Sequence, residues 1–170
     1  TSGEIVPIKQ LCEGEKILSI NLDSMKTCQA ECTAIYSRSS NTAFKLVFES
    51  PGELITATPE HLFFVLTEKG FEEKTVEELV EGDKVPIVIS DNPKAANHKI
   101  TFCTLKQKTA FTPSPEEKFY DLVIPSTQKF VANRLIVHNS AARFQRIHEE
   151  TVEKYYQRVG EAMNAFVGIK

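Results

Sequence analysis

The residues of this chain with the clearest capacity for chemistry are the tetrapeptide Val137-His138-Asn139-Ser140. The side-chain amide of an asparagine can attack the backbone carbonyl of the same residue, which closes a succinimide and cuts the chain. The adjacent His138 can relay a proton to the departing amine, and Ser140 can act as an oxygen nucleophile toward an upstream acyl group. A simpler interpretation is that Asn139 or Ser140 caps a following helix.

A second candidate site is the segment Thr58-Pro59-Glu60-His61. Pro59 stiffens a turn, so the hydroxyl of Thr58 and the imidazole of His61 can both face one peptide bond. The histidine would protonate the leaving nitrogen of that bond, and the threonine would hold the bond or its oxyanion. The alternative is a β-turn in which both side chains only satisfy backbone groups.

The third candidate is Asp121, an acidic residue within the apolar run 119–124. Burying a carboxylate without a partner costs free energy. We therefore expect Asp121 either at a site, close to other polar groups, or facing solvent on an edge strand.

The elements that would position these residues are short runs of β-branched and aromatic residues separated by turn signals. They predict strands at 16–22, 43–48, 61–66, 84–89, 119–124 and 134–137, and hence an all-β domain. Thr75, followed three residues later by Glu78, predicts one short helix over 75–79. The polar stretch 90–117 predicts a long surface connection with one strand near 99–105.

The pattern becomes helical after Ser140. Apolar residues spaced by three and four, from Phe144 to Phe166, predict an amphipathic helix that ends near Gly168. A single helix of this kind is not stable alone. We therefore expect two parts, a β-domain at 1–139 and a separate segment at 140–170.

Composition narrows the function classes. The 170 residues carry a net charge of −3, so the chain lacks the basic character of nucleic-acid binders, and no DNA partner is expected. No apolar run is long enough to span a membrane, and the first residues do not resemble a signal peptide, so we expect a cytoplasmic protein. The four cysteines do not complete a zinc site and are too few for a disulfide framework.

Three ordered segments together resemble the splicing blocks of inteins, which have the Hint fold shared with hedgehog autoprocessing domains. They are the turn 58–61, the stretch 79–85 with the pattern Leu-x-x-Gly-Asp-x-Val, and the run 119–140 that ends in His-Asn-Ser. The resemblance implies a pseudo-twofold β-domain that excises itself once from a host protein, rather than a turnover enzyme. Because 90–117 leaves no room for a homing endonuclease, the chain resembles a mini-intein.

The resemblance also implies a role for each candidate residue. His61 and Thr58 would activate the upstream splice junction, and Asp121 would assist the nucleophilic steps. At the downstream junction, Ser140 would receive the upstream host segment as an ester. Asn139 would then cyclise with help from His138, and an oxygen-to-nitrogen acyl shift would form the final peptide bond. The resemblance implies no metal, nucleotide or other cofactor.

The chain departs from the intein pattern in two places. Gln128 stands where the family often has a histidine, and an amide cannot transfer a proton at neutral pH. The opening strand, which begins with Cys or Ser, is absent, and Ser2 gives a poor register for that role. We expect the partners to be a missing N-terminal strand and an upstream host segment.

The segment from Ser140 resembles archaeal and eukaryotic class 1 peptide chain release factors just after their Gly-Gly-Gln loop. The resemblance depends on the pattern Ser-Ala-x-Arg-Phe-x-Arg, which includes Arg143 and Arg146, and on the phase of the helix. It implies a host that binds the ribosome. A generic amphipathic helix is the alternative for this segment.

Two other functions remain open for the whole chain. The first is a non-catalytic β-rich binding module of a translation factor. The second is a hedgehog-like domain that cleaves only at its start, but such a domain has no need of a His-Asn-Ser ending.

Overall fold

The structure is a computed structural model and describes residues 5–49, 54–89 and 98–139. Ser140 and the helix predicted for the segment after it, with its end near Gly168, lie outside the described residues. Among the described residues, no helix has the length and apolarity needed to cross a membrane.

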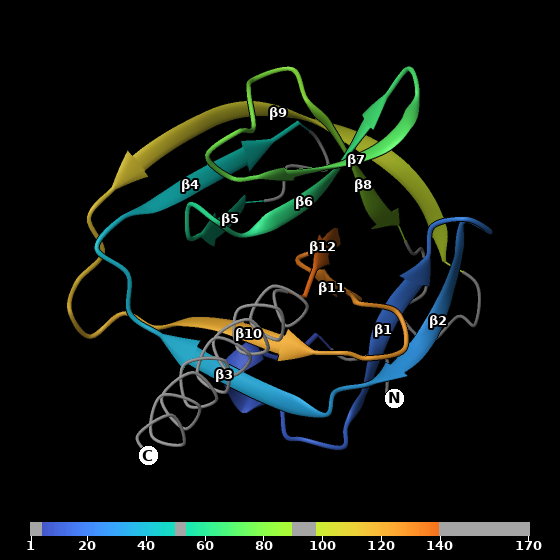
Figure 1. The fold of residues 1–170 in the computed structure, drawn as a ribbon, viewed down its shortest axis with the longest axis horizontal. Helices are drawn as coiled ribbons and strands as arrows, with labels where there is room; N and C mark the ends of the chain where they lie inside the picture. Colours follow the sequence, from blue (N-terminus) through green and yellow to red (C-terminus); the bar gives the residue numbers. More distant parts are fainter. Residues whose placement is uncertain (1–4, 50–53, 90–97, 140–170) are drawn as a thin grey trace, which may run out of the picture. The chain divides into compact units, whose positions relative to one another are not determined.

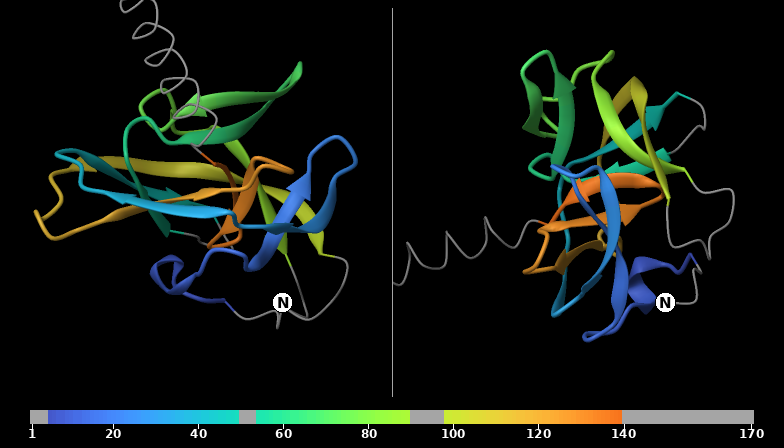
Figure 2. Two further views of the ribbon diagram at one scale, coloured as in Figure 1. Left: turned by 60° about the horizontal axis from the view of Figure 1, so that its bottom comes forward. Right: turned by 90° about the vertical axis from the view of Figure 1, so that its right-hand side faces the viewer.

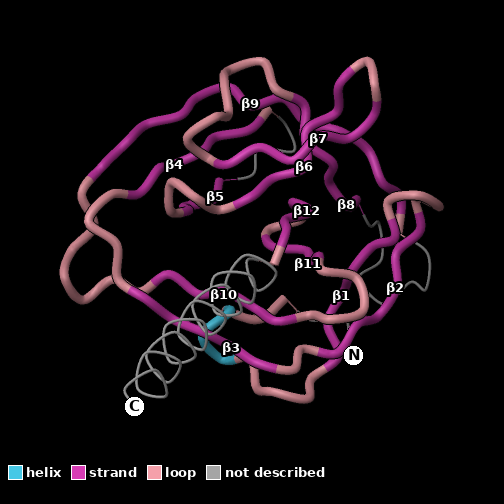
Figure 3. Tube along the Cα trace, viewed as in Figure 1, coloured by secondary structure: helices cyan, strands magenta, loops and turns pink. Residues whose placement is uncertain are grey.

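The described residues form strands almost throughout, and the only helical element among them is the short 3-10 turn η1 (Ile8–Gln10) (Figure 3). This confirms the all-β class. The strands are β1 (Lys16–Asn21), β2 (Lys26–Glu31), β3 (Ala34–Arg38), β4 (Ala43–Phe48), β5 (Leu54–Ala57), β6 (Leu62–Thr67), β7 (Gly70–Thr75), β8 (Lys84–Ile89), β9 (Lys99–Phe111), β10 (Phe119–Val123), β11 (Lys129–Ala132) and β12 (Leu135–His138).

The six strands predicted from apolar runs correspond to β1, β4, β6, β8, β10 and β12. Five strands escaped prediction: β2, β3, β5, β7 and β11. They are short or polar, as in the Glu- and Lys-containing β7, which lies at the edge of its sheet. Edge strands carry charges that discourage pairing with other chains, so their apolar pattern is weak.

The strands form one large sheet and two antiparallel pairs. The large sheet has the order β5-β4-β9-β8-β12-β6-β7, with β11 paired to β12. The pairs are β1 with β2 and β3 with β10. Figure 1 shows the β11–β12 hairpin between β6 above it and β10 below it, and Figure 2 shows the same hairpin near the middle of the strands from two other sides.

Strand β12 is the most deeply buried part of this arrangement. Leu135, Ile136 and Val137 are each 0% exposed. Leu135 and Val137 face the larger apolar core, and Ile136 faces the smaller one with Phe64. A strand covered on both faces has a continuous run of apolar residues in its sequence. The burial of each such side chain contributes about 1.5–3 kcal/mol to the stability of the fold. The residues that follow β12 are therefore held firmly.

The stretch 90–117 differs from its prediction as a surface connection with one strand near 99–105. Within its described part, 98–117, β9 extends over 13 residues. Its first half pairs with β8 and its second half with β4 (Figure 1). The strand is polar because it is only partly buried, and polar composition alone could not separate it from a loop. Residues 90–97 lie outside the described part of the chain.

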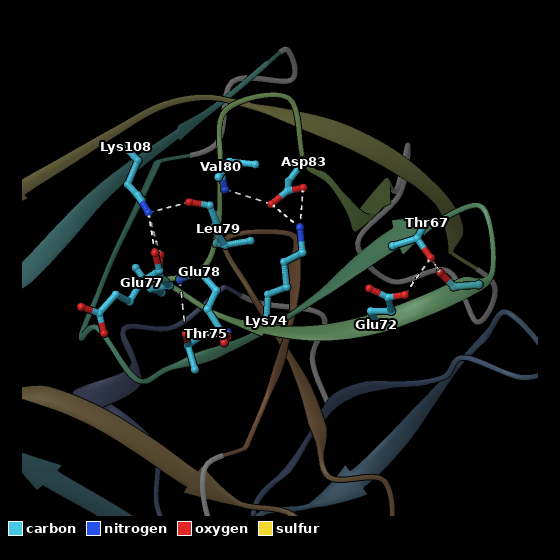
Figure 4. A network of polar contacts seen from close by, with 12 residues as sticks. Thr67, Glu72, Lys74, Thr75, Glu77, Glu78, Leu79, Val80, Asp83 and Lys108 are labelled. Carbon is cyan, nitrogen blue, oxygen red and sulfur yellow. Dashed lines mark hydrogen bonds and ion pairs between the residues drawn. The ribbon is translucent and has the colours of Figure 1, made fainter.

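The short helix predicted over 75–79 was wrong, although its capping signal is real. Thr75 N–H donates to the Glu78 carboxylate (2.8 Å), and Glu78 N–H is directed at the Thr75 hydroxyl (3.3 Å). The chain then makes one helical turn, with Leu79 N–H bonded to the Thr75 carbonyl (3.0 Å), and leaves it. The Lys108 ammonium of β9 donates to the carbonyls of Val76, Glu77 and Leu79, which this turn leaves free (Figure 4).

The stretch 79–85 then makes a tight turn onto β8. Gly82 has a φ of +99°, a backbone conformation that favours glycine. The Asp83 carboxylate accepts from Val80 N–H (3.0 Å) and pairs with Lys74 at 2.9 Å (Figure 4). Leu79 and Val85, at the ends of the turn, are fully buried. The Leu-x-x-Gly-Asp-x-Val pattern thus encodes a turn that leads into β8 and whose two ends are anchored in the core by Leu79 and Val85.

Replacing Lys108 with Met should destabilise the domain by about 1–3 kcal/mol, because partly buried carbonyls lose their donor. Urea unfolding followed by circular dichroism measures this as a lower midpoint. Lys106→Met is the matched control on the same strand, because Lys106 makes an exposed ion pair with Glu49, and exposed pairs contribute little. Equal midpoints for the two variants would contradict this account of Lys108.

Candidate functional site

The pairing of β12 with β6 brings the candidate residues together. Val137 lies opposite Phe63 in an antiparallel ladder. Two residues further along each strand, the same register leads to Asn139 and His61. Residues in opposed positions project to the same face of a sheet, so this register directs the two side chains to one face at the same end of the two strands.

Asn139 is almost completely buried, with 1% of its surface exposed. Its backbone N–H donates to the Gln128 carbonyl (2.9 Å). Its side-chain amide fits best with the oxygen accepting from Ile124 N–H (2.8 Å) and the nitrogen donating to the Gln128 carbonyl (3.3 Å). The amide nitrogen therefore faces an acceptor, and the amide oxygen is held by a donor.

His138 lies against the same peptide unit. Its Nδ1 donates a hydrogen bond to the carbonyl oxygen of Asn139. The ring packs on Phe64 with a centroid distance of 5.6 Å, and only 6% of the residue is exposed. Alternation along β12 places His138 and His61 on opposite faces, so the two imidazoles approach the end of this strand from different sides.

The segment 58–61 forms the predicted turn, with His61 N–H bonded to the Thr58 carbonyl (3.1 Å). The turn is anchored on both sides, because Glu77 N–H donates to the Pro59 carbonyl (3.0 Å) and Val76 N–H to the His61 carbonyl (2.8 Å). The helical turn after β7 is therefore the support on which this turn is built.

Arg38, at the end of β3, is a site residue that the sequence did not reveal. Its Nη2 donates to the Thr58 hydroxyl (2.9 Å) and forms an ion pair with Glu60. Thr58 is 4% exposed, so its hydroxyl is fixed by a charged donor. Only the meeting of β3 with the 58–61 turn identifies Arg38, because no local motif surrounds it.

Burial lowers the pKa of His61 below its ordinary value, because the charged ring loses water. The negative charge of Asp121 acts in the opposite direction, while positive charge on His138 and on Arg38 lowers the pKa further. His61 is therefore neutral in the resting domain at pH 7. A neutral imidazole in this position can accept a proton and later return it.

Asp121 lies on β10 at a half-buried position, opposite Tyr36 of β3. Its carboxylate accepts from Leu122 N–H (3.0 Å) and is the negative charge that acts on His61. The sequence left two possibilities for Asp121, a position close to other polar groups of a site or a solvent-facing position on an edge strand. This geometry agrees with the first.

A surface groove of about 1710 Å³ is lined in part by the residues around His61. Thr58, His61 and Asp121 line its polar part, and the apolar part includes Ile5 and Leu54, which are 85% and 43% exposed. The groove therefore has the volume for a stretch of polypeptide and extends to His61.

The described residues contain no group of three or more His, Cys, Asp or Glu side chains placed to hold a metal. All four cysteines are free thiols, and Cys32 is fully buried. Burial raises the pKa of the Cys32 thiol, which keeps it protonated.

Five of the six candidate residues therefore gather around the end of β12, and the sixth, Ser140, lies outside the described residues. The five are Thr58, His61, Asp121, His138 and Asn139. Sequence reasoning missed Arg38 and the backbone groups of Ile124 and Gln128. Gln128 contributes its carbonyl, while its side chain is exposed and its φ is +57°.

Comparison with known families gives one match, a family model described as the intein splicing domain, over residues 1–139. A search of curated proteins finds no match.

Several solved structures resemble the domain. A variant of the Ssp DnaB mini-intein is 26% identical, with a TM-score of 0.66 over 81% of this chain and 84% of that one. The PabCDC21-1 intein is 23% identical, with a TM-score of 0.64 over 73% and 69%. A bacterial intein-like domain from Clostridium thermocellum is 20% identical, with a TM-score of 0.62 over 79% and 88%. These similarities confirm the predicted Hint fold.

The lowered pKa of His61 predicts a pH-dependent contribution to stability. Below the ordinary pKa of about 6.5, the unfolded chain binds a proton that the folded chain resists, so the free energy of unfolding falls as pH falls from 6.5 toward the lowered pKa. His61→Gln should remove this component. Urea unfolding at several pH values, in chains that also carry Asn139→Ala to prevent self-cleavage, should show a weaker dependence on pH for the variant. Parallel stability curves would contradict the account of His61.

Proposed function

The chain belongs to the family of intein splicing domains, and from this premise we propose that it completes splicing by cleaving its own backbone between Asn139 and Ser140. The observation that carries this proposal is the hydrogen bond between His138 Nδ1 and the Asn139 carbonyl oxygen. That carbonyl is the group that asparagine cyclisation attacks. A donor at its oxygen stabilises the negative charge that develops there.

The cyclisation step follows from these contacts. The side-chain nitrogen of Asn139 forms a bond to its own carbonyl carbon, and the bond from that carbon to the nitrogen of Ser140 breaks. The attacking amide loses one proton and the departing amine gains one, so no proton is consumed overall. The Gln128 carbonyl, 3.3 Å from the amide nitrogen, accepts a hydrogen bond from that nitrogen. His138 polarises the Asn139 carbonyl that is attacked.

The upstream junction would lie in the groove beside His61. A nucleophilic hydroxyl or thiol there attacks the carbonyl of the upstream peptide bond, and the neutral His61 takes its proton. The same imidazole then gives the proton to the nitrogen that leaves. Thr58, whose hydroxyl is fixed by Arg38 (2.9 Å), holds the peptide bond in place, and Asp121 stabilises the transient charge on His61.

The remaining steps depend on Ser140. Its hydroxyl attacks the acyl carbon held by the first nucleophile, the bond to that nucleophile breaks, and the nucleophile leaves as a hydroxyl or thiol that takes up the proton. The upstream acyl group is then an ester of Ser140, which gives a branched chain. Cyclisation of Asn139 releases this ester-linked product, and attack by the freed amine on the ester forms a normal peptide bond. The acyl transfer must come before the cyclisation of Asn139, because cyclisation first would separate the two host parts.

We further propose that the host is a class 1 peptide chain release factor, which would place splicing in the cytoplasm, where translation ends. The support is the pattern Ser-Ala-x-Arg-Phe-x-Arg, which begins at Ser140 and includes Arg143 and Arg146. Sequencing the DNA immediately upstream of the splicing domain tests it. A host reading frame that ends in Gly-Gly-Gln supports the proposal, and an unrelated frame overturns it.

The purified chain should release a fragment that begins at Ser140, and Asn139→Ala should abolish the release. Intact-mass spectrometry over a time course measures both. The larger product should be one water lighter than the hydrolysed form, because cyclisation leaves a succinimide. Asn41→Ala, at an exposed position, is the matched control and should cleave like the original chain. Release from the Asn139→Ala chain would show that another process cuts it.

Trans-splicing should follow when a synthetic peptide that carries the upstream host residues and the opening strand is added. We expect a product that joins the host residues of the peptide to the segment from Ser140, detected by mass. His61→Ala should slow its formation about 100-fold or more, because proton transfer to the leaving nitrogen is lost. The same variant should still release the fragment that begins at Ser140. Equal trans-splicing with and without His61 would contradict its assignment to the upstream junction.

A further inference from the structure

We infer that Glu73 is a positioning residue for cleavage after Asn139, acting through His138. This inference rests on the proposed function and adds a residue that none of the splicing motifs contains. Glu73 lies in β7, an edge strand whose sequence gave no signal of a site. Its carboxylate oxygen Oε1 lies 3.5 Å from Nε2 of His138.

The sheet register brings Glu73 to this position. Glu73 lies opposite Phe64 in the β6–β7 ladder, so the two side chains share a face. His138 packs on the same Phe64 ring. The carboxylate therefore reaches the imidazole from the edge strand, on the side away from His61.

The two nitrogens of His138 have different partners. Nδ1 contacts the Asn139 carbonyl oxygen, and Nε2 faces the carboxylate of Glu73. Both partners are acceptors, and an imidazole donates from both nitrogens only when each carries a proton. The carboxylate therefore faces the nitrogen through which a proton can reach or leave the ring, while Nδ1 is directed at the carbonyl.

The carboxylate also fixes the direction of the ring. With Phe64 against one face and an acceptor at each nitrogen, the imidazole cannot turn without losing a contact. Half of the Glu73 side chain is exposed, whereas 8% of the His138 side chain is. The carboxylate therefore reaches the buried ring from the surface of the domain.

Other charged groups approach His138 from the strands packed around it. Lys129 of β11 lies opposite His138, but its ammonium is over the Phe64 ring (5.2 Å) and donates to the Thr127 carbonyl (3.0 Å). His61 acts from the opposite face. Asp23 lines the same surface hollow as Glu73 and Lys129. Among the described residues, Glu73 is the carboxylate for which the structure gives a direct approach to the His138 ring.

The test is the rate of release of the fragment from Ser140 between pH 5.5 and 8.5, followed by mass spectrometry. Glu73→Gln keeps the shape of the side chain and removes its charge. We expect cleavage to slow about tenfold or more at pH 8, and by less than about threefold near pH 5.5, where solvent supplies the proton.

Two comparisons separate positioning from a loss of folding. Glu72→Gln, on the opposite face of β7, should leave the profile unchanged. In the His138→Ala background, Glu73→Gln should cause no further loss, because Glu73 acts through His138. The inference would be overturned if the pH profile of Glu73→Gln coincided with that of the original chain. It would also be overturned if Glu73→Gln slowed cleavage equally with and without His138. If the original chain itself releases no fragment, the proposed function fails instead.

Discussion

The burial of β12 on both faces is the constraint on which the site depends. Three consecutive side chains without solvent exposure hold this strand between β11, β6 and β8. A slip of one residue would move each of them to the wrong core. Because the strand cannot slip, His138 and Asn139 emerge at a fixed point and a fixed orientation. Apolar packing thus supplies the precision that an intramolecular attack requires.

Backbone groups hold the reacting amide more than side chains do. Asn139 is positioned by the carbonyl of Gln128 and the amide of Ile124, both of which belong to the connection between β10 and β11. Gln128 takes a left-handed conformation, with φ at +57°, and this directs its carbonyl toward Asn139. The departure from the family pattern at this position therefore leaves the backbone contact intact, even though the side chain cannot transfer a proton.

The two histidines lie on opposite faces at the end of β12 and have different surroundings. Partial burial lowers the pKa of His61 and keeps it neutral, and the negative charge of Asp121 acts in the opposite direction. His138 lies on the other face, between the Asn139 carbonyl and Glu73. The β6–β7 hairpin and the turn that follows it contact the surroundings of both histidines. This segment supports the 58–61 turn through Val76 and Glu77, and it carries the carboxylate near His138.

The sequence by itself determined the all-β class, the six most apolar strands and five of the residues that meet at the end of β12. It could do so because apolar alternation and the His-Asn-Ser, Thr-x-x-His and Gly-Asp patterns are local. It could not determine the length of β9, because the polar residues of this strand pair with two different strands. Nor could it show that residues 75–79 form one helical turn instead of a helix, because tertiary contacts end the helix that the cap begins. Only the tertiary structure revealed the contacts of Arg38, Glu73 and the Gln128 carbonyl. These groups come from strands and loops far apart in the chain, and strand pairing, rather than local sequence, brings them together.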